Sequence, residues 1–163
     1  MLTAQSQREL AILDRQLIEN NLRAIYDARK RGDIQALVHL LSEKIRANVV
    51  STTGSYGFVG PVIGTEQMLR ALRTIEAEVE LLDTEIIDMV IDGDCASVHR
   101  KVVMRGRGTG VTREMHAFDY CKFENGILVE VEQFTDTQAL DVARGQHAGP
   151  AGENRKLRSS KYL

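Results

Sequence analysis

The sequence has few of the features that mark several large classes of protein. It contains two cysteines, Cys95 and Cys121, which are too few for a disulfide scaffold and fit a reduced intracellular chain. Their spacing is not that of zinc ligands, and no histidine accompanies them in a ligand pattern. The first residues, MLTAQSQREL, have no apolar run like that of a signal peptide, and charges interrupt every longer apolar stretch. We therefore expect a cytoplasmic protein with no membrane span and no metal site.

The chain also has no excess of charge of either sign. Lys and Arg number 21 and Asp and Glu number 23, so the net charge is -2 and neither nucleic acid nor an anionic membrane is expected as a partner. The glycine-rich stretch GRGTG lies between two expected strands and does not open a helix, so no dinucleotide cofactor is expected. The 163 residues, 43% of them hydrophobic, suit one globular domain with a sizeable core.

Helical spacing of apolar residues dominates the first half of the chain. It predicts a long helix over residues 5–31 that ends at Gly32, and a short helix that Asp33 caps and that runs to about Leu41. A third helix is predicted from Thr65, its expected cap, to about Ala77. Between them, residues 45–51 are short and contain several β-branched residues, which predicts a strand, and the glycine-rich residues 51–64 predict a loop.

From Val79 onward the period of the pattern changes to two. Four strands are predicted over residues 80–91, 94–106, 111–124 and 127–134, and the short breaks between them contain Gly or Asn and predict antiparallel hairpins. A last short helix is expected over 135–144 and a flexible tail over 145–163. Helices followed by an antiparallel meander predict an α+β domain over residues 1–144.

Alternate residues of these strands define an apolar face that carries a few polar groups. The hairpin through GRGTG pairs residues whose numbers add to about 217 to 219, which places Arg100 and Asp119 on one face, opposed or diagonal. Gln133 joins them from the last strand, and Glu85 from the first if no bulge intervenes. A buried charge must be paired or meet a ligand, so two interpretations stay open. The pair closes a core, or it forms the polar end of an apolar cavity that holds a small molecule.

The opposite face of the sheet is expected to be a homodimer interface. It is too apolar and aromatic for a free surface, and its two histidines are expected to serve an interface or to meet solvent. The residues predicted on it are Val90, Ile86, His99, His116, Phe118 and Tyr120.

Three segments in this order resemble the SnoaL-like members of the nuclear transport factor 2-like superfamily: NLRAIYDARKRGDIQALVHLLSEKIRANVV, VIGTEQMLRAL and FDYCKFENGILVEVEQFTDTQAL. The resemblance covers about residues 8–144. It implies a cone-shaped, cystatin-like α+β roll, in which a strongly curved sheet wraps around the N-terminal helices and leaves a pocket at the open end. Such proteins include ketosteroid isomerases, polyketide cyclases, limonene epoxide hydrolases, dehydratases and non-catalytic binding modules, so the fold alone does not give a function.

The resemblance implies roles for particular residues. Asp119 matches an aspartate that donates to the substrate oxyanion in the isomerases and resembles an acid/base in the cyclases. The position of the isomerase's general base is Val49 here, and its oxyanion tyrosine aligns with Ile25, one residue before Tyr26. Arg100 matches the arginine of the epoxide hydrolases.

The epoxide hydrolases hold that arginine between two aspartates. Both aspartate positions differ here, since they are occupied by Val102 and Gln133, so that mechanism is not expected.

The sequence leaves two possible functions open. The first is a cofactor-independent acid/base enzyme, an isomerase, cyclase or dehydratase-type lyase acting on a small cyclic or carbonyl compound, with Asp119 and Arg100 as catalytic residues. The second is a non-catalytic ligand-binding or dimerisation module in which the same pair is structural, and Val49 in place of a base favours it. The residues expected to contact the small apolar molecule are Tyr26, Val49, Glu85, Met104, Met115, Ala117 and Gln133.

Overall fold

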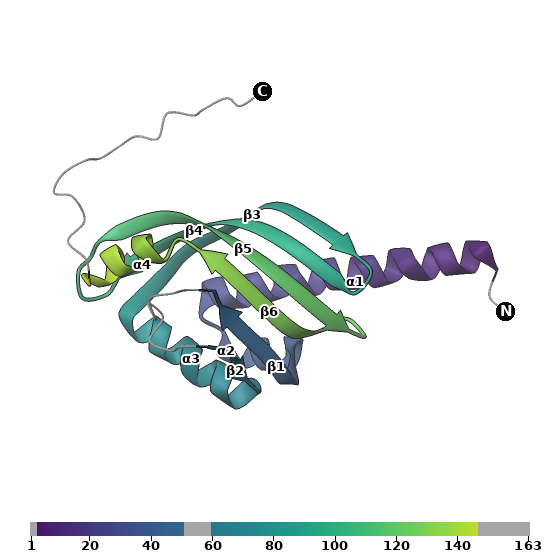
Figure 1. Ribbon diagram of the computed structural model, residues 1–163, viewed down its shortest axis with the longest axis horizontal. Coiled ribbons are helices and arrows are strands. Elements are labelled where there is room, and N and C mark those ends of the chain that lie inside the picture. The colour runs from purple at the N-terminus through teal and green to yellow at the C-terminus, as the bar shows by residue number, and fades with distance from the viewer. Residues whose placement is uncertain (1–2, 51–59, 147–163) are drawn as a thin grey trace, which may run out of the picture.

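A curved sheet wraps around a long N-terminal helix in the computed structural model of the protein, which describes residues 3–50 and 60–146 (Figure 1). The elements, in chain order, are α1 (Ala4–Arg31), α2 (Ile34–Leu40), β1 (Leu41–Val49), β2 (Val62–Ile63), α3 (Thr65–Glu78), β3 (Val79–Asp92), β4 (Cys95–Gly106), β5 (Thr112–Glu124), β6 (Ile127–Thr135) and α4 (Thr137–Arg144). The α+β class is confirmed. Most of the expected tail, residues 147–163, lies outside the described residues.

The ends of the first two helices follow the local chemistry of the sequence. Gly32 ends α1 in the left-handed conformation at φ 65, and the Asp33 side chain accepts a hydrogen bond from the Ala36 amide at the start of α2. The prediction that Thr65 caps α3 is wrong. Gly64 is the residue before the helix, and the Thr65 hydroxyl instead donates to the Ser42 carbonyl at 3.2 Å, which fastens α3 to β1.

The sheet has six strands in the order β2-β1-β6-β5-β4-β3. The predicted hairpins β3–β4, β4–β5 and β5–β6 are antiparallel, whereas β1 runs parallel to β6. The sheet is therefore mixed and not wholly antiparallel. The direction of β1 could not come from hairpin rules, because β1 and β6 are separated by residues 50–126 and no tight turn joins them.

Two irregularities in β3 change which side chains face inward. The register with β4 shifts between Leu81 and Asp83 and again between Ile86 and Asp88. At the second shift β3 has one residue more than its partner strand. Residues 83–86, which lie between the two shifts, therefore face the side opposite to the one that regular alternation predicts. As a result Ile86 packs against the core, and Glu85 lies on the outer face, where it pairs with Lys101 at 2.9 Å. The predictions of Glu85 on the inner face and Ile86 on the outer face are both wrong.

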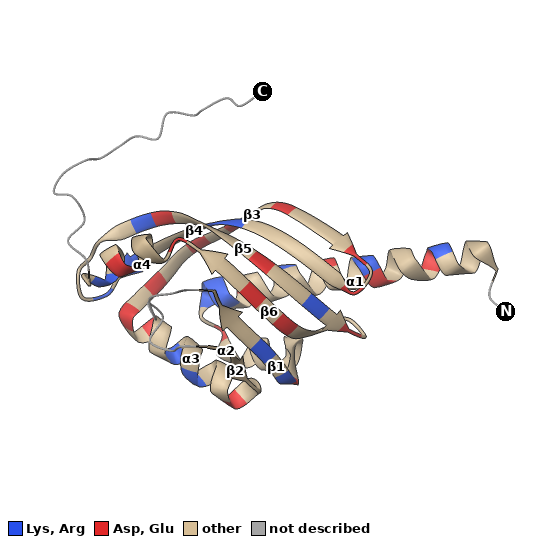
Figure 2. Ribbon diagram, viewed as in Figure 1, with Lys and Arg blue, Asp and Glu red and all other residues tan. Residues whose placement is uncertain are grey.

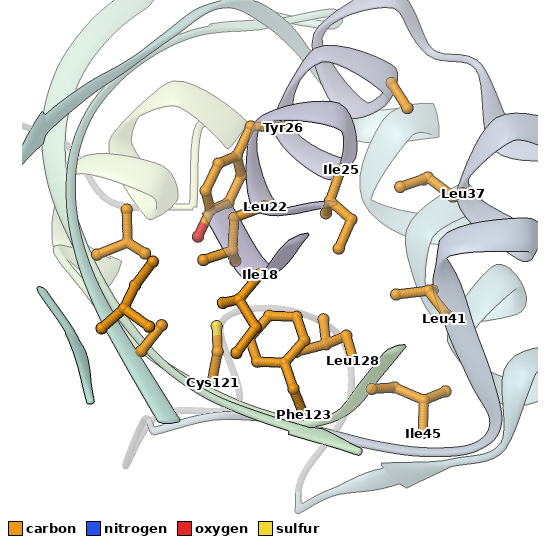
Figure 3. Packing of buried hydrophobic residues seen from close by; sticks show 14 of the residues in the cluster. Ile18, Leu22, Ile25, Tyr26, Leu37, Leu41, Ile45, Cys121, Phe123 and Leu128 are labelled. Carbon is orange, nitrogen blue, oxygen red and sulfur yellow. The ribbon is translucent and has the colours of Figure 1, made fainter. Parts of the chain in front are cut away.

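The main core lies between α1 and the concave face of the sheet (Figure 3). Ile18, Leu22 and Ile25 follow one another at helical spacing on α1 and pack with side chains of β5 and β6. A second cluster lies toward α4 and contains Val79, Val102, Met104, Met115, Ala117 and Leu140.

Charges of both signs are interspersed along the ribbon (Figure 2). Within the described residues, no helix combines the length and the apolar character that crossing a membrane requires.

Candidate functional site

A cavity of about 140 Å³ opens between α1, α3 and the concave face of the sheet. Its walls are mainly aliphatic side chains, and every strand of the sheet contributes at least one residue. The lining residues include Tyr26, Val49, Ala71, Leu72, Arg100, Met104, Ala117, Asp119 and Gln133.

Asp119 is the centre of a polar cluster on the cavity wall and is only 2% exposed. Its Oδ2 accepts hydrogen bonds from the Tyr26 hydroxyl at 2.7 Å and from Arg100 Nε at 2.7 Å. Its Oδ1 accepts from Gln133 Nε2 at 2.9 Å. Two strands and one helix thus bring three side chains to one carboxylate, and Figure 3 shows the Tyr26 ring reaching from α1 toward the strands.

The strand register explains the contact between Arg100 and Asp119. Arg100 is paired with Ala117, so the residue numbers add to 217 and Arg100 lies diagonal to Asp119 on the same face. The prediction that both side chains point to the concave face within hydrogen-bond reach is confirmed. Their contact is a charge-assisted hydrogen bond between two side chains that water barely reaches.

Arg100 is held on several sides, but one of its nitrogens has no acceptor among the described residues. Nη1 donates to Thr84 Oγ1 at 3.0 Å, and the guanidinium carbon lies 4.4 Å from the centre of the Tyr26 ring. Among the described residues, none accepts a hydrogen bond from Nη2, and this nitrogen is not sealed away from solvent. Because Arg100 lines the cavity, Nη2 can donate to a molecule inside it.

Burial and the Asp119 charge set the protonation of the neighbouring groups. Burial, followed by the negative charge of Asp119, raises the pKa of Tyr26 well above its ordinary value. Burial also raises the pKa of the Cys121 thiol. For Arg100 burial lowers the pKa, but the attraction of Asp119 outweighs it and the net shift is upward. Tyr26 and Cys121 are therefore neutral and Arg100 is charged at neutral pH, so Cys121 is not an activated nucleophile.

The geometry makes Asp119 a poor proton acceptor as it stands. Both of its oxygens already accept hydrogen bonds, and a substrate proton would have to displace one of the donors. Val49, which the resemblance aligned with the position of an isomerase's base, lines the cavity. Of the described residues that line the cavity, Asp119 is the only carboxylate, and none is a histidine.

Most of the predicted ligand contacts lie at the cavity. Tyr26 reaches Asp119 despite being one residue away from the aligned position, and Gln133 donates to Asp119. Glu85 lies on the outer face of the sheet because of the extra residue in β3. Met115 is buried, but in the second cluster and not on the cavity wall. The predicted residues on the wall are Tyr26, Val49, Arg100, Met104, Ala117, Asp119 and Gln133.

The sequence prediction missed Thr84 and the α3 wall. Thr84 replaces Glu85 as the inward-facing residue because of the extra residue in β3, which no turn signal marks. Ala71 and Leu72 of α3 could have been found, because they follow Met68 by three and four residues on the buried side of that helix. In residues 3–50 and 60–146, no three or more His, Cys, Asp or Glu side chains cluster in a way that could hold a metal ion.

Comparison with known proteins gives a family and a fold. A family model described as a SnoaL-like domain matches residues 22–131. No curated protein matches the sequence at a significant level. An NTF2-like protein of unknown function from Burkholderia pseudomallei is 18% identical with a TM-score of 0.69, over 78% of this chain and 96% of the other.

Two further solved structures resemble the protein in fold. A candidate isomerase from Bacillus subtilis has a TM-score of 0.74 at 11% identity, over 82% of this chain and 96% of the other. TerC, co-crystallised with polyporic acid, has a TM-score of 0.70 at 16% identity, over 79% of this chain and 98% of the other. At these identities the likeness establishes the fold alone.

Proposed function

Because the chain belongs to the SnoaL-like domain family, we propose that it binds a small, largely apolar molecule in the cone cavity and that Arg100 donates from Nη2 to one oxygen atom of that molecule. The observation that carries the proposal is the hydrogen bonding of the Arg100 guanidinium. Asp119 and Thr84 fix two of its nitrogens, no described residue accepts from the third, and the residue lines an apolar cavity. An apolar pocket with a few fixed polar groups is the usual form of a small-molecule site.

The size of the cavity limits the ligand. Its volume of about 140 Å³ is close to that of engineered cavities of about 150 Å³ that hold benzene. A single six-membered ring is therefore the expected size. The related fold of TerC holds polyporic acid, which supports a ring compound as the class of ligand here.

The charge balance of the site favours a neutral ligand. The positive charge of Arg100 is already compensated by Asp119 at 2.7 Å, so an anionic ligand would bring an uncompensated charge into an apolar cavity. A carbonyl oxygen can accept from Nη2 without adding charge. A cyclic ketone is thus a suitable probe of the site.

An acid/base reaction on such a ketone is the second candidate, and it is favoured because Asp119 is the only carboxylate among the described residues that line the cavity. The Tyr26 hydroxyl, which donates to Asp119 at 2.7 Å, is one of the donors that could give way. In this reaction Asp119 would take the α-proton of the ketone after losing one of its donors. The enolate oxygen would accept from Arg100, and the same proton would return to another carbon. Exchange of α-protons of 2-cyclohexenone in heavy water, lost in Asp119→Asn, is the result this candidate expects.

A homodimer through the outer face of the sheet is the assembly that we propose. Val90 is 59% exposed and Phe118 is 49% exposed, and Phe134 lies beside Phe118 in register and is 48% exposed. Such a patch is larger and more aromatic than isolated apolar residues on a monomer surface.

Paired substitutions on α3 test the binding proposal. Ala71 faces the cavity, whereas Ala77 is exposed on the same helix, so Ala71→Leu fills the cavity and Ala77→Leu is its matched control. We expect cyclohexanone to shift the methyl NMR signals of cavity residues in the wild type and in Ala77→Leu but not in Ala71→Leu. Equal binding by all three proteins would contradict the proposal.

A further substitution tests the role of Arg100. Arg100→Lys keeps the positive charge beside Asp119 but removes the forked guanidinium donors. It should weaken binding of cyclohexanone and leave binding of cyclohexane, which has no oxygen, unchanged. Equal weakening of both would show that Arg100 shapes the cavity without donating to the ligand.

A further inference from the structure

The side-chain amide of Gln133 is held in one orientation by Asp119. Its Nε2 donates to Asp119 Oδ1 at 2.9 Å, and the two residues are directly paired in the register of β5 and β6. A carboxylate that is paired with an arginine only accepts hydrogen bonds, so turning the amide round would bring its carbonyl oxygen against another acceptor. The carbonyl oxygen Oε1 therefore lies on the branch of the planar amide that does not contact Asp119 Oδ1.

Oε1 of Gln133 has no hydrogen-bond donor within the described part of the chain. No donor in residues 3–50 or 60–146 reaches it, and the atom is not sealed away from solvent. Gln133 lines the cavity, and its neighbour on β1 in the register is the apolar Val49. Because a polar atom on an apolar wall needs a partner, Oε1 can accept a hydrogen bond from a molecule inside the cavity.

This acceptor and the donor Nη2 of Arg100 are both attached to one carboxylate. Arg100 Nε contacts Oδ2 of Asp119, and Gln133 Nε2 contacts Oδ1. Nη2 lies on the same edge of the planar guanidinium as Nε, so it lies on the side of Arg100 that faces Asp119. A molecule in the cavity beside this carboxylate can therefore meet a donor from Arg100 and an acceptor from Gln133 together.

From this arrangement, and resting on the proposed binding of a small ring in the cavity, we propose that Gln133 selects ligands that carry a hydrogen-bond donor beside their oxygen atom. The ligand class is then a neutral single ring with a carbonyl oxygen for Arg100 Nη2 and an adjacent N–H or O–H group for Gln133 Oε1. A lactam is the simplest such ring, because its N–H adjoins its carbonyl group. An N–H without an acceptor is costly in an apolar cavity, so Gln133 determines whether this class binds.

Binding of 2-piperidone and of cyclohexanone to the wild type and to Gln133→Met tests the proposal. Both compounds are six-membered rings with a carbonyl group, and 2-piperidone has an N–H where cyclohexanone has a CH₂ beside it. Methionine is similar in length to glutamine and removes the acceptor. The substitution should weaken 2-piperidone about tenfold, the size of one lost hydrogen bond, and cyclohexanone by less than about twofold. Comparing the two proteins cancels the different hydration of the two compounds.

Gln138→Met is the matched control, because Gln138 is exposed on α4 and does not line the cavity, and both compounds should bind to it as to the wild type. Circular dichroism establishes first that each variant is folded, since Gln133→Met takes a donor from Asp119. A second measurement uses the wild type alone. The NMR signal of the Gln133 side-chain carbonyl carbon should shift more with 2-piperidone than with cyclohexanone.

The two compounds separate failure of this inference from failure of the proposed function. Equal weakening of both compounds in Gln133→Met, or unchanged binding of 2-piperidone, would overturn selection by Gln133. Wild-type protein that binds cyclohexanone but not 2-piperidone would overturn it too, and the binding of a ring in the cavity would stand. If the wild type binds neither compound, the proposed function itself is contradicted.

Discussion

Removing the charge of Asp119 while keeping its shape should strongly destabilise the protein. In Asp119→Asn, one side-chain oxygen can still accept from Tyr26 and Arg100, and the Gln133 amide can turn to accept from the new NH₂ group. The change therefore removes mainly the charge that compensates Arg100, which is only 7% exposed. Breaking a buried pair in this way costs about 3–5 kcal/mol of unfolding free energy. For a domain of this size each kcal/mol lowers the melting temperature by about 2–4 °C, so a fall of roughly 6–20 °C is expected.

A thermal melt followed by circular dichroism measures this fall. The matched control is Asp83→Asn, which removes the same charge from an ion pair with Lys30 whose side chains are 49% and 46% exposed. Solvent screens that pair, so the control should melt close to the wild type. If Asp119→Asn also melts close to the wild type, Arg100 does not depend on Asp119 for compensation, and the account of the polar cluster is refuted.

Three other results are expected. Because burial raises the pKa of Tyr26 above the value of about 10 in the unfolded chain, the folded protein retains a proton that the unfolded chain loses. Stability should then fall as the pH rises above about 10, and urea unfolding should show a shallower fall in Tyr26→Phe; equal slopes would contradict this. Iodoacetamide should label Cys95 but not the buried Cys121 in the native protein, so labelling of native Cys95→Ser would be unexpected. Phe118→Asp should convert a dimer to a monomer in sedimentation, and a wild type that is already monomeric at micromolar concentration would count against the outer-face dimer.

The antiparallel half of the fold was predictable because it depends on local signals. Tight turns at Asp92-Gly93, GRGTG and Asn125-Gly126 fix the register of successive strands, and the register then determines the faces. This is why the Arg100–Asp119 contact followed from arithmetic on residue numbers. The parallel pairing of β1 with β6 depends on packing between distant segments, and no local pattern specifies it.

The irregularities of β3 limited the prediction of the site. One extra residue near Ile87 exchanges Glu85 for Thr84 on the inner face, and the sequence around it has no Gly or Pro to mark the change. Tyr26 shows a different limit. The alignment placed Tyr26 one position after the residue that matches the isomerase's tyrosine. Its long side chain, on a helix that crosses the concave face, nevertheless brings the hydroxyl to 2.7 Å from Asp119 Oδ2. Contacts between a helix and a sheet depend on how the helix is seated, which periodicity does not specify.

A crystal structure of the protein soaked with 2-cyclohexenone tests the central claim most directly. The account predicts density for one ring in the cavity beside Ala71 and Leu72, with the ketone oxygen within hydrogen-bond distance of Arg100 Nη2 and the contact between Arg100 and Asp119 retained. An empty cavity at saturating ketone, or a ring bound with its oxygen away from Arg100, would contradict it.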